Sequence, residues 1–187
     1  MVLLRKIIVR SVLGIVAIAG LYALYTVATG NFHTVIAGEL YRSARPSAAQ
    51  IASWHERYGI KTILNLQGAH PEDAWYREEV AAAKAHGIEL INYKLSAQRD
   101  VTAVQLEELL DIMSNAERPI LIHCRSGADR TGLVSAFYVA GIAGGSELYA
   151  EFQLTPYFGH FPFEFMSFYA MDRSFEAHEA RLGIPDS

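Results

Sequence analysis

The sequence has only one cysteine and a long uncharged N-terminal stretch, and these absences narrow the possibilities. Because Cys124 is alone, no disulfide can form within the chain, and the fold must depend on its hydrophobic core. No acidic residue precedes Glu39, and residues 11–38 carry no formal charge. No group of residues has metal-ligand spacing, so we expect neither a metal nor another cofactor.

The charge balance of the remaining chain also excludes some partners. Residues 39–187 contain all twenty acidic residues but only thirteen of the sixteen basic ones, which gives a net charge of −7. A nucleic-acid partner requires a basic face, so we expect none. The same balance argues against broad attraction to an anionic membrane surface.

The N-terminal residues 1–30 are interpreted as a membrane anchor. Residues 12–28 are almost wholly apolar, and at 1.5 Å per residue they give about 26 Å of helix, at the short end of what spans a bilayer. Basic residues precede this run, so the positive-inside rule predicts a cytoplasmic N-terminus. We therefore expect a single-pass protein of the inner membrane, with the domain of residues 31–187 outside the cytoplasm, in the periplasm. The basic residues are Arg5, Lys6 and Arg10.

Two other interpretations of the N-terminal stretch stay open. A cleavable signal peptide would release the domain into the periplasm, although Thr26-Val27-Ala28 is a weak small-x-small cleavage site. A buried core helix is the third interpretation.

After a linker over about 31–36, the chain alternates expected strands and helices. This order predicts an α/β fold, with a mostly parallel central sheet flanked by helices and with ligand at the carboxyl ends of the strands. Ser47 with Gln50, and Thr102 with Gln105, have capping-box spacing and predict two helix starts. The expected strands are 39–43, 61–66, 88–93 and 118–122, and the expected helices include 71–86, 133–140, 147–153 and 163–182.

The ten residues 123–132, HCRSGADRTG, stand between an expected buried strand and an expected helix. A strand, a tight loop and a helix N-terminus in this order make an anion site, because backbone N–H groups and the helix dipole favour negative charge. Helix N-termini and nearby cations also lower the pKa of a cysteine thiol, which makes the sulfur of Cys124 a candidate nucleophile.

Other side chains of this stretch suit the same chemistry. Arg130 can hold two phosphate oxygens with its planar fork. Thr131 can donate a hydroxyl hydrogen bond to the thiolate, and His123 can orient the loop through its ring N–H. Asp129 more plausibly braces the loop. The expected phosphate-binding residues are Arg125, Ser126, Gly127, Ala128, Asp129 and Arg130.

The pattern of His-Cys, five residues, Arg and then Thr resembles the signature loop of cysteine-dependent protein tyrosine and dual-specificity phosphatases. Residues 40–46, LYRSARP, and the order of elements after them resemble the compact bacterial, fungal and plant branch of that superfamily. The resemblance implies a phosphomonoester hydrolase that forms a cysteinyl-phosphate. In those relatives the early segment looks structural, so we expect Arg42 and Arg45 to form ion pairs in the fold rather than contact the substrate.

The resemblance also implies a general acid on a loop upstream of the nucleophile. Asp100 is the only carboxylate in residues 94–101, and it is the expected acid, with Asp73 as the alternative. Cys124, Arg130, Asp100, Thr131 and His123 are thus the expected catalytic residues.

Several substrate classes and one non-enzymatic role remain possible. A phosphorylated protein, handled by a protein tyrosine or dual-specificity phosphatase, is the favoured substrate. A phosphoinositide or another phospholipid is the alternative, suggested by the expected anchor. A membrane protein that only binds a phospho-ligand is the alternative of another class. The aromatic residues around 157–169 are expected to pack in the core, or otherwise to border an apolar substrate or lipid.

Overall fold

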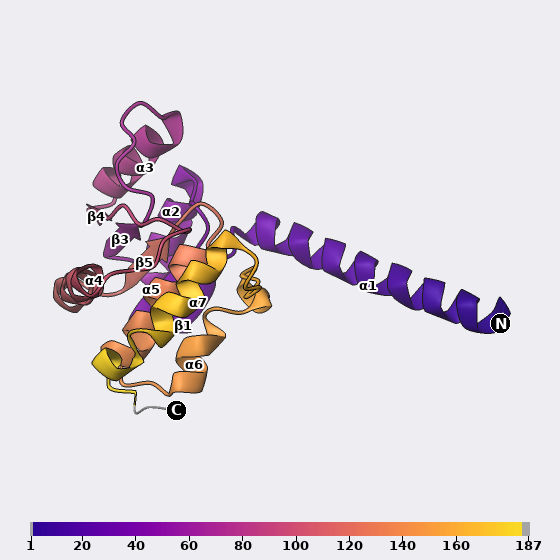
Figure 1. The fold of residues 1–187 in the computed structure, drawn as a ribbon. Coiled ribbons are helices and arrows are strands. Elements are labelled where there is room, and N and C mark those ends of the chain that lie inside the picture. The colour runs from indigo at the N-terminus through magenta and orange to yellow at the C-terminus, as the bar shows by residue number, and fades with distance from the viewer. Residues whose placement is uncertain (1, 185–187) are drawn as a thin grey trace.

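A computed structural model describes residues 2–184 and contains a five-stranded mixed sheet with helices on both faces (Figure 1). The strand order is β1-β2-β5-β3-β4, in which β2, β5, β3 and β4 run parallel and β1 pairs antiparallel with β2. The predicted α/β fold with a mostly parallel sheet is therefore confirmed. The strands are β1 (His33–Ile36), β2 (Leu40–Ser43), β3 (Thr62–Asn65), β4 (Glu89–Asn92) and β5 (Ile120–His123).

Most helices lie where the sequence places them, and both predicted capping boxes are present, at Ser47 with Gln50 and at Thr102 with Gln105. The expected helix over 163–182 is instead broken into short pieces, because its first part consists largely of aromatic residues, whose helix propensity is modest. The helices after α1 are α2 (Ala48–Tyr58), α3 (Ala74–Ala85), α4 (Ala103–Asn115), α5 (Asp129–Gly141), α6 (Glu147–Phe152) and α7 (Ala170–Glu176), with 3₁₀ turns η1 (Pro156–Phe158), η2 (Ser167–Tyr169) and η3 (Glu179–Leu182).

Each face of the sheet has its own hydrophobic core. Successive side chains of a strand point to opposite faces, so Leu64 packs in the core that includes Phe137 of α5, while Ile63 packs with Ile51 and Trp54 of α2. Residues 131–140 of α5 are all buried. The parallel register aligns the ends of β2, β5 and β3, so the segments that follow them meet at one edge of the sheet.

Helix α1 (Val2–Thr29) projects from the domain, and only its C-terminal end lies near the rest of the chain (Figure 1). The helix is followed by two residues with positive φ, Gly30 at 67° and Asn31 at 49°, which turn the chain towards β1. Asn31 is buried, and its side-chain amide donates to the backbone oxygens of Ser126 and Phe158, at 3.0 and 2.9 Å. The expected linker therefore contains strand β1, and the buried side chain of Asn31 attaches it to the rest of the domain.

The predicted membrane anchor is wrong. Within residues 2–184, no helix combines the length and the apolar character that a membrane crossing requires. The unbroken apolar run gives only about 26 Å of helix, against a hydrocarbon core of about 30 Å, and it includes Gly14, Gly20, Tyr22 and Tyr25. The single-pass localisation in the inner membrane, with a periplasmic domain, depended on this anchor and is corrected with it.

Candidate active site

Residues 124–130, called here the Cys124 loop, comprise the connection from β5 to α5 and the first two residues of α5, at the edge where the parallel strands end. Cys124 is 1% exposed and is the only cysteine. Gly127 has a φ of 73°, and a Cβ at this position would lie 2.5 Å from the backbone nitrogen of Ala44. The loop therefore packs against the chain after β2 so closely that only glycine fits at residue 127.

The carbonyl groups of the Cys124 loop are bound from outside the loop. Asn31 donates to the oxygen of Ser126, and the guanidinium of Arg42 donates to the oxygens of Gly127 and Ala128, at 2.8 and 3.2 Å. In a planar trans peptide the next N–H points opposite to the carbonyl. The N–H groups of residues 127–129 therefore face the opposite side, where they can receive an anion.

Arg42 is fully buried beneath the Cys124 loop, and it makes no ion pair among the described residues. Its Nη1 donates to the backbone and side-chain oxygens of Gln153, at 2.8 and 3.0 Å, and the ring of Phe158 lies 3.9 Å from the guanidinium carbon. Burial lowers the pKa of Arg42 to about 9, although the nearby Cys124 and Asp129 raise it in part. Arg42 is therefore charged at neutral pH, and it has the expected structural role through carbonyl groups instead of ion pairs.

Arg130 is positioned by two backbone oxygens. Its Nη1 donates to the carbonyls of Leu66 and Leu95, both at 3.2 Å, and its buried Nε has no hydrogen-bond partner among the described residues. These contacts hold the guanidinium between the segments that follow β3 and β4. The remaining N–H groups are available to bind oxygens of an anion above the Cys124 loop.

His123 and Thr131 are both fully buried. Nε2 of His123 lies 2.6 Å from Oε1 of Glu79 on α3, a partner that sequence reasoning missed. The side chain of Asn65 donates to the other oxygen of Glu79 at 3.3 Å. The hydroxyl of Thr131 has no hydrogen-bond partner among the described residues, so it is free to donate to the sulfur.

Asp129 belongs to a charged cluster that connects the Cys124 loop to α7. The buried ring of His160 lies between two carboxylates, with Nδ1 at 2.8 Å from Asp129 and Nε2 at 2.9 Å from Asp172. Burial lowers the pKa of His160, but the hydrogen bonds and charges of the two carboxylates outweigh burial and raise it to about 9. The imidazole is therefore protonated at pH 7 and neutralises a carboxylate within the loop.

Asp100 lies on the surface beside α7. Its Oδ1 is 2.7 Å from Nη2 of Arg173, and its side chain is 59% exposed. The backbone N–H of the next residue, Val101, donates to the hydroxyl oxygen of Ser174, and the carbonyl oxygen of Val101 lies 2.8 Å from Nε2 of His178. The structure thus brings Cys124, Arg130, Thr131 and the loop residues together, whereas Asp100 is paired with Arg173 instead of with a residue of the loop.

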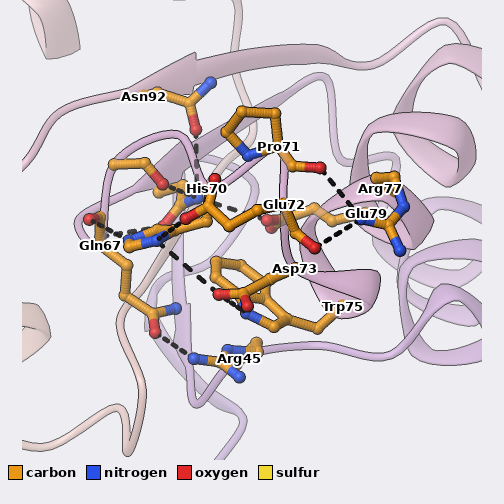
Figure 2. A network of polar contacts seen from close by, with 12 residues as sticks. Arg45, Gln67, His70, Pro71, Glu72, Asp73, Trp75, Arg77, Glu79 and Asn92 are labelled. Atoms are coloured by element: carbon orange, nitrogen blue, oxygen red, sulfur yellow. Dashed lines mark hydrogen bonds and ion pairs between the residues drawn. The ribbon is translucent and has the colours of Figure 1, made fainter.

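The segment between β3 and α3 forms a polar network (Figure 2). At the start of this segment, the carbonyl of Leu66 accepts a hydrogen bond from Arg130. The indole N–H of Trp75 donates to Asp73, and the guanidinium carbon of Arg45 lies 3.8 Å from the centre of the Trp75 ring. Arg45 also donates to the side-chain oxygen of Gln67. Asp73, the alternative acid, is therefore already a hydrogen-bond acceptor for Trp75, and Arg45 does not make its expected ion pair with any residue of 2–184.

The fold and the Cys124 loop are those of the cysteine-dependent phosphatase family. A family model described as "DSP-PTPase phosphatase fused to NAD+ Kinase" matches residues 24–155, and the chain belongs to this family. The family assignment from the signature loop is confirmed.

Two curated proteins are similar to this chain. The inositol diphosphatase SIW14 of Saccharomyces cerevisiae is 36% identical over 107 residues, which cover 54% of this chain and 36% of that protein. The dual specificity protein phosphatase TpbA of Pseudomonas aeruginosa is 30% identical over 107 residues, which cover 56% of this chain and 44% of TpbA. The chain thus matches less than half of the length of each relative.

Solved structures of the same two proteins resemble this fold. The structure of P. aeruginosa TpbA has a TM-score of 0.61 at 26% identity and covers 83% of this chain and 91% of that one. The core catalytic domain of PP-IP phosphatase SIW14, in complex with citrate, has a TM-score of 0.61 at 27% identity, covering 82% of this chain and 90% of that chain.

Replacement of Gly127 by alanine will disrupt the site more than it disrupts the fold. The added Cβ meets backbone atoms of residues 43 and 44, so the loop must move, and a displacement of about 1 Å costs on the order of 100-fold in rate. Gly38→Ala is the matched control, because Gly38 has a φ of 77° but open space around the added Cβ. Each variant loses about 1 kcal/mol of stability to backbone strain. Equal kcat/KM values for the two variants would contradict this prediction.

The His160 cluster predicts a pH-dependent loss of stability. The pKa of His160 is higher in the folded chain than in the unfolded one, so its contribution is complete below about pH 6.5 and declines as the pH rises towards 9. The melting temperature of the wild type should exceed that of His160→Gln by roughly 5 °C at pH 6.5, and the difference should shrink by pH 9. His55→Gln is the control, since Nδ1 of His55 faces a carbonyl oxygen. A pH-independent difference for His160→Gln would refute the charged bridge.

Proposed function

We propose that the chain is a protein tyrosine or dual-specificity phosphatase. The observation that carries this proposal is the Cys124 loop with Arg130, whose N–H groups can receive a phosphate. A groove of about 750 Å³ lies beside the loop, and it is lined mainly by apolar side chains with Arg125, Ser126 and Asp129, whereas Cys124 and Arg130 are not among its lining residues. The apolar surface suits the aromatic ring of a phosphotyrosine substrate or the peptide around it, while the loop receives the dianionic phosphate.

The proposed reaction has two steps. The thiolate of Cys124 attacks phosphorus and forms an S–P bond, while the bond from phosphorus to the substrate oxygen breaks. The loop N–H groups and Arg130 stabilise the three equatorial oxygens, and Asp100 gives its proton to the leaving oxygen. Asp100 then accepts a proton from water as the water oxygen attacks phosphorus, which releases phosphate and the thiolate. Thr131 stabilises that thiolate through its free hydroxyl.

The other substrate classes are less well supported. The phospholipid alternative was suggested by the predicted anchor, which the structure does not support. A small polyphosphate should be compared directly with a phosphotyrosine peptide as a substrate, because the similar protein SIW14 is an inositol diphosphatase.

Hydrolysis by the whole chain should be compared on a phosphotyrosine peptide, a phosphoserine peptide and an inositol diphosphate. We expect the highest kcat/KM for the phosphotyrosine peptide, loss of activity in Cys124→Ser, and a phosphorylated Cys124 after rapid acid quenching. A preference for the inositol diphosphate would overturn the substrate proposal and leave the cysteine mechanism in place. Failure to detect phosphate on Cys124 during turnover would overturn the mechanism itself.

Asp100→Asn should lower kcat by about 100-fold to 10,000-fold for a tyrosine-like leaving group, which must be protonated as it departs. The loss should be much smaller for p-nitrophenyl phosphate, because its leaving group is stable as an anion. Asp73→Asn is the comparison, and we expect no dependence on the leaving group in that variant. If the dependence occurs in Asp73→Asn and not in Asp100→Asn, Asp73 is the acid.

A further inference from the structure

Arg45 is held rigidly at the same groove as the Cys124 loop. Its guanidinium stacks on Trp75 and donates to Gln67, as Figure 2 shows, and its backbone N–H donates to the oxygen of Arg125 at 3.4 Å. Both Arg45 and Arg125 line the groove. A long cationic side chain fixed by a ring and an amide is pre-organised to bind, because little rotamer freedom is left to lose.

Within residues 2–184, the groove residues Arg45 and Arg125, and the neighbouring Arg130, which does not line the groove, lack anionic partners. Among residues 2–184, none of Arg45, Arg125 and Arg130 lies within 4.0 Å of a carboxylate, whereas the exposed Arg173 and Arg181 are both paired. Burial lowers the pKa of Arg45, and the charge of Arg125 and then that of Arg130 lower it further, while Glu79 and Asp73 raise it. The fold therefore keeps like charges near one another, and an anion between them would relieve their repulsion.

The buried neighbour of Arg45 supplies a further unused donor. Gln67 is 8% exposed and accepts from Arg45 with its side-chain oxygen, but its Nε2 is buried and has no hydrogen-bond partner among the described residues. A buried amide without a partner is unfavourable, so an acceptor at this place would also satisfy Gln67.

We propose that Arg45 and Arg125 form a second anion subsite, which binds the carboxylate of an acidic residue next to the phosphotyrosine. This inference rests on the proposed function, since it presumes a peptide substrate. Adjacent Cα atoms are about 3.8 Å apart, so a neighbouring Asp or Glu projects from the peptide close to the phosphorylated residue. The Cys124 loop binds the phosphate, and the arginine pair then selects the sequence around it.

The test uses three phosphotyrosine peptides that differ only in the flanking residues, which are glutamate, glutamine or lysine. For the wild type we expect kcat/KM to be about tenfold higher with glutamate than with glutamine, and lower still with lysine. The ratio of kcat/KM for the glutamate peptide to kcat/KM for the glutamine peptide should decline between low and high salt, because the subsite is partly exposed to solvent. The ratio of glutamate to glutamine peptide is the readout, so a general change in activity does not affect it.

Arg45→Gln and Arg125→Gln should each reduce this ratio towards one, and the double variant should abolish it. Arg45→Lys keeps the charge but loses the planar stacking on Trp75, so it should retain only part of the preference. Arg57→Gln is the matched control, because Arg57 lies over Tyr58 on α2, outside the groove. A wild-type ratio of one, or an unchanged ratio in folded Arg45→Gln, would overturn the subsite.

The outcomes separate this inference from the proposed function. Hydrolysis of all three peptides at equal rates overturns the subsite alone. No hydrolysis of any of them, together with turnover of p-nitrophenyl phosphate, overturns the protein-phosphatase proposal and the subsite with it. If the Arg45→Gln substitution lowers kcat/KM only for an inositol diphosphate, and not for the peptides, the arginine pair binds a second phosphate. A peptide carboxylate as the ligand is then excluded.

Discussion

The buried charge of Arg42 is the interaction on which the geometry of the Cys124 loop depends. Its guanidinium binds the carbonyls of Gly127 and Ala128 from below, and it binds Gln153 with its other nitrogen. A buried guanidinium is costly when its donors lack partners, and although Nε of Arg42 has none among the described residues, both Nη atoms bind oxygens, so these carbonyls face Arg42. Because carbonyl and N–H groups alternate across each peptide plane, the same constraint directs the loop N–H groups towards the anion.

The C-terminal segment belongs to the active site as much as the central sheet does. Three consecutive residues of α7 connect this helix to both loops. Asp172 pairs with His160, which pairs in turn with Asp129 of the Cys124 loop. Arg173 pairs with Asp100, and Ser174 accepts a hydrogen bond from the N–H of Val101. The Cys124 loop and the loop with the proposed acid are therefore attached to one short helix. A shift of α7 would change the positions of both loops together.

Local pattern was sufficient for much of the fold. The apolar runs predicted four of the five strands, and side chains at capping-box spacing predicted the starts of α2 and α4. Strand β1 was missed, because its four residues lie at an edge and gain their pairing only from β2. The membrane anchor was wrong, because apolar composition was taken as sufficient, whereas no helix within residues 2–184 has both the length and the apolar character that a membrane crossing requires. Most aromatic residues around 157–169 are exposed, so the expectation of core packing was also wrong for them.

The sequence alone determined the chemical parts of the site: a single cysteine, an arginine six residues later, and glycines at the positions where the backbone needs them. These parts are close in the chain, and their relation follows from a strand, a loop and a helix N-terminus. Only the tertiary structure decided which polar groups are paired. Arg42 with Gln153, Asn31 with Phe158 and Asp100 with Arg173 are separated by 111, 127 and 73 positions. Contacts at such distances depend on how the elements pack, and residue type and spacing do not encode that packing locally.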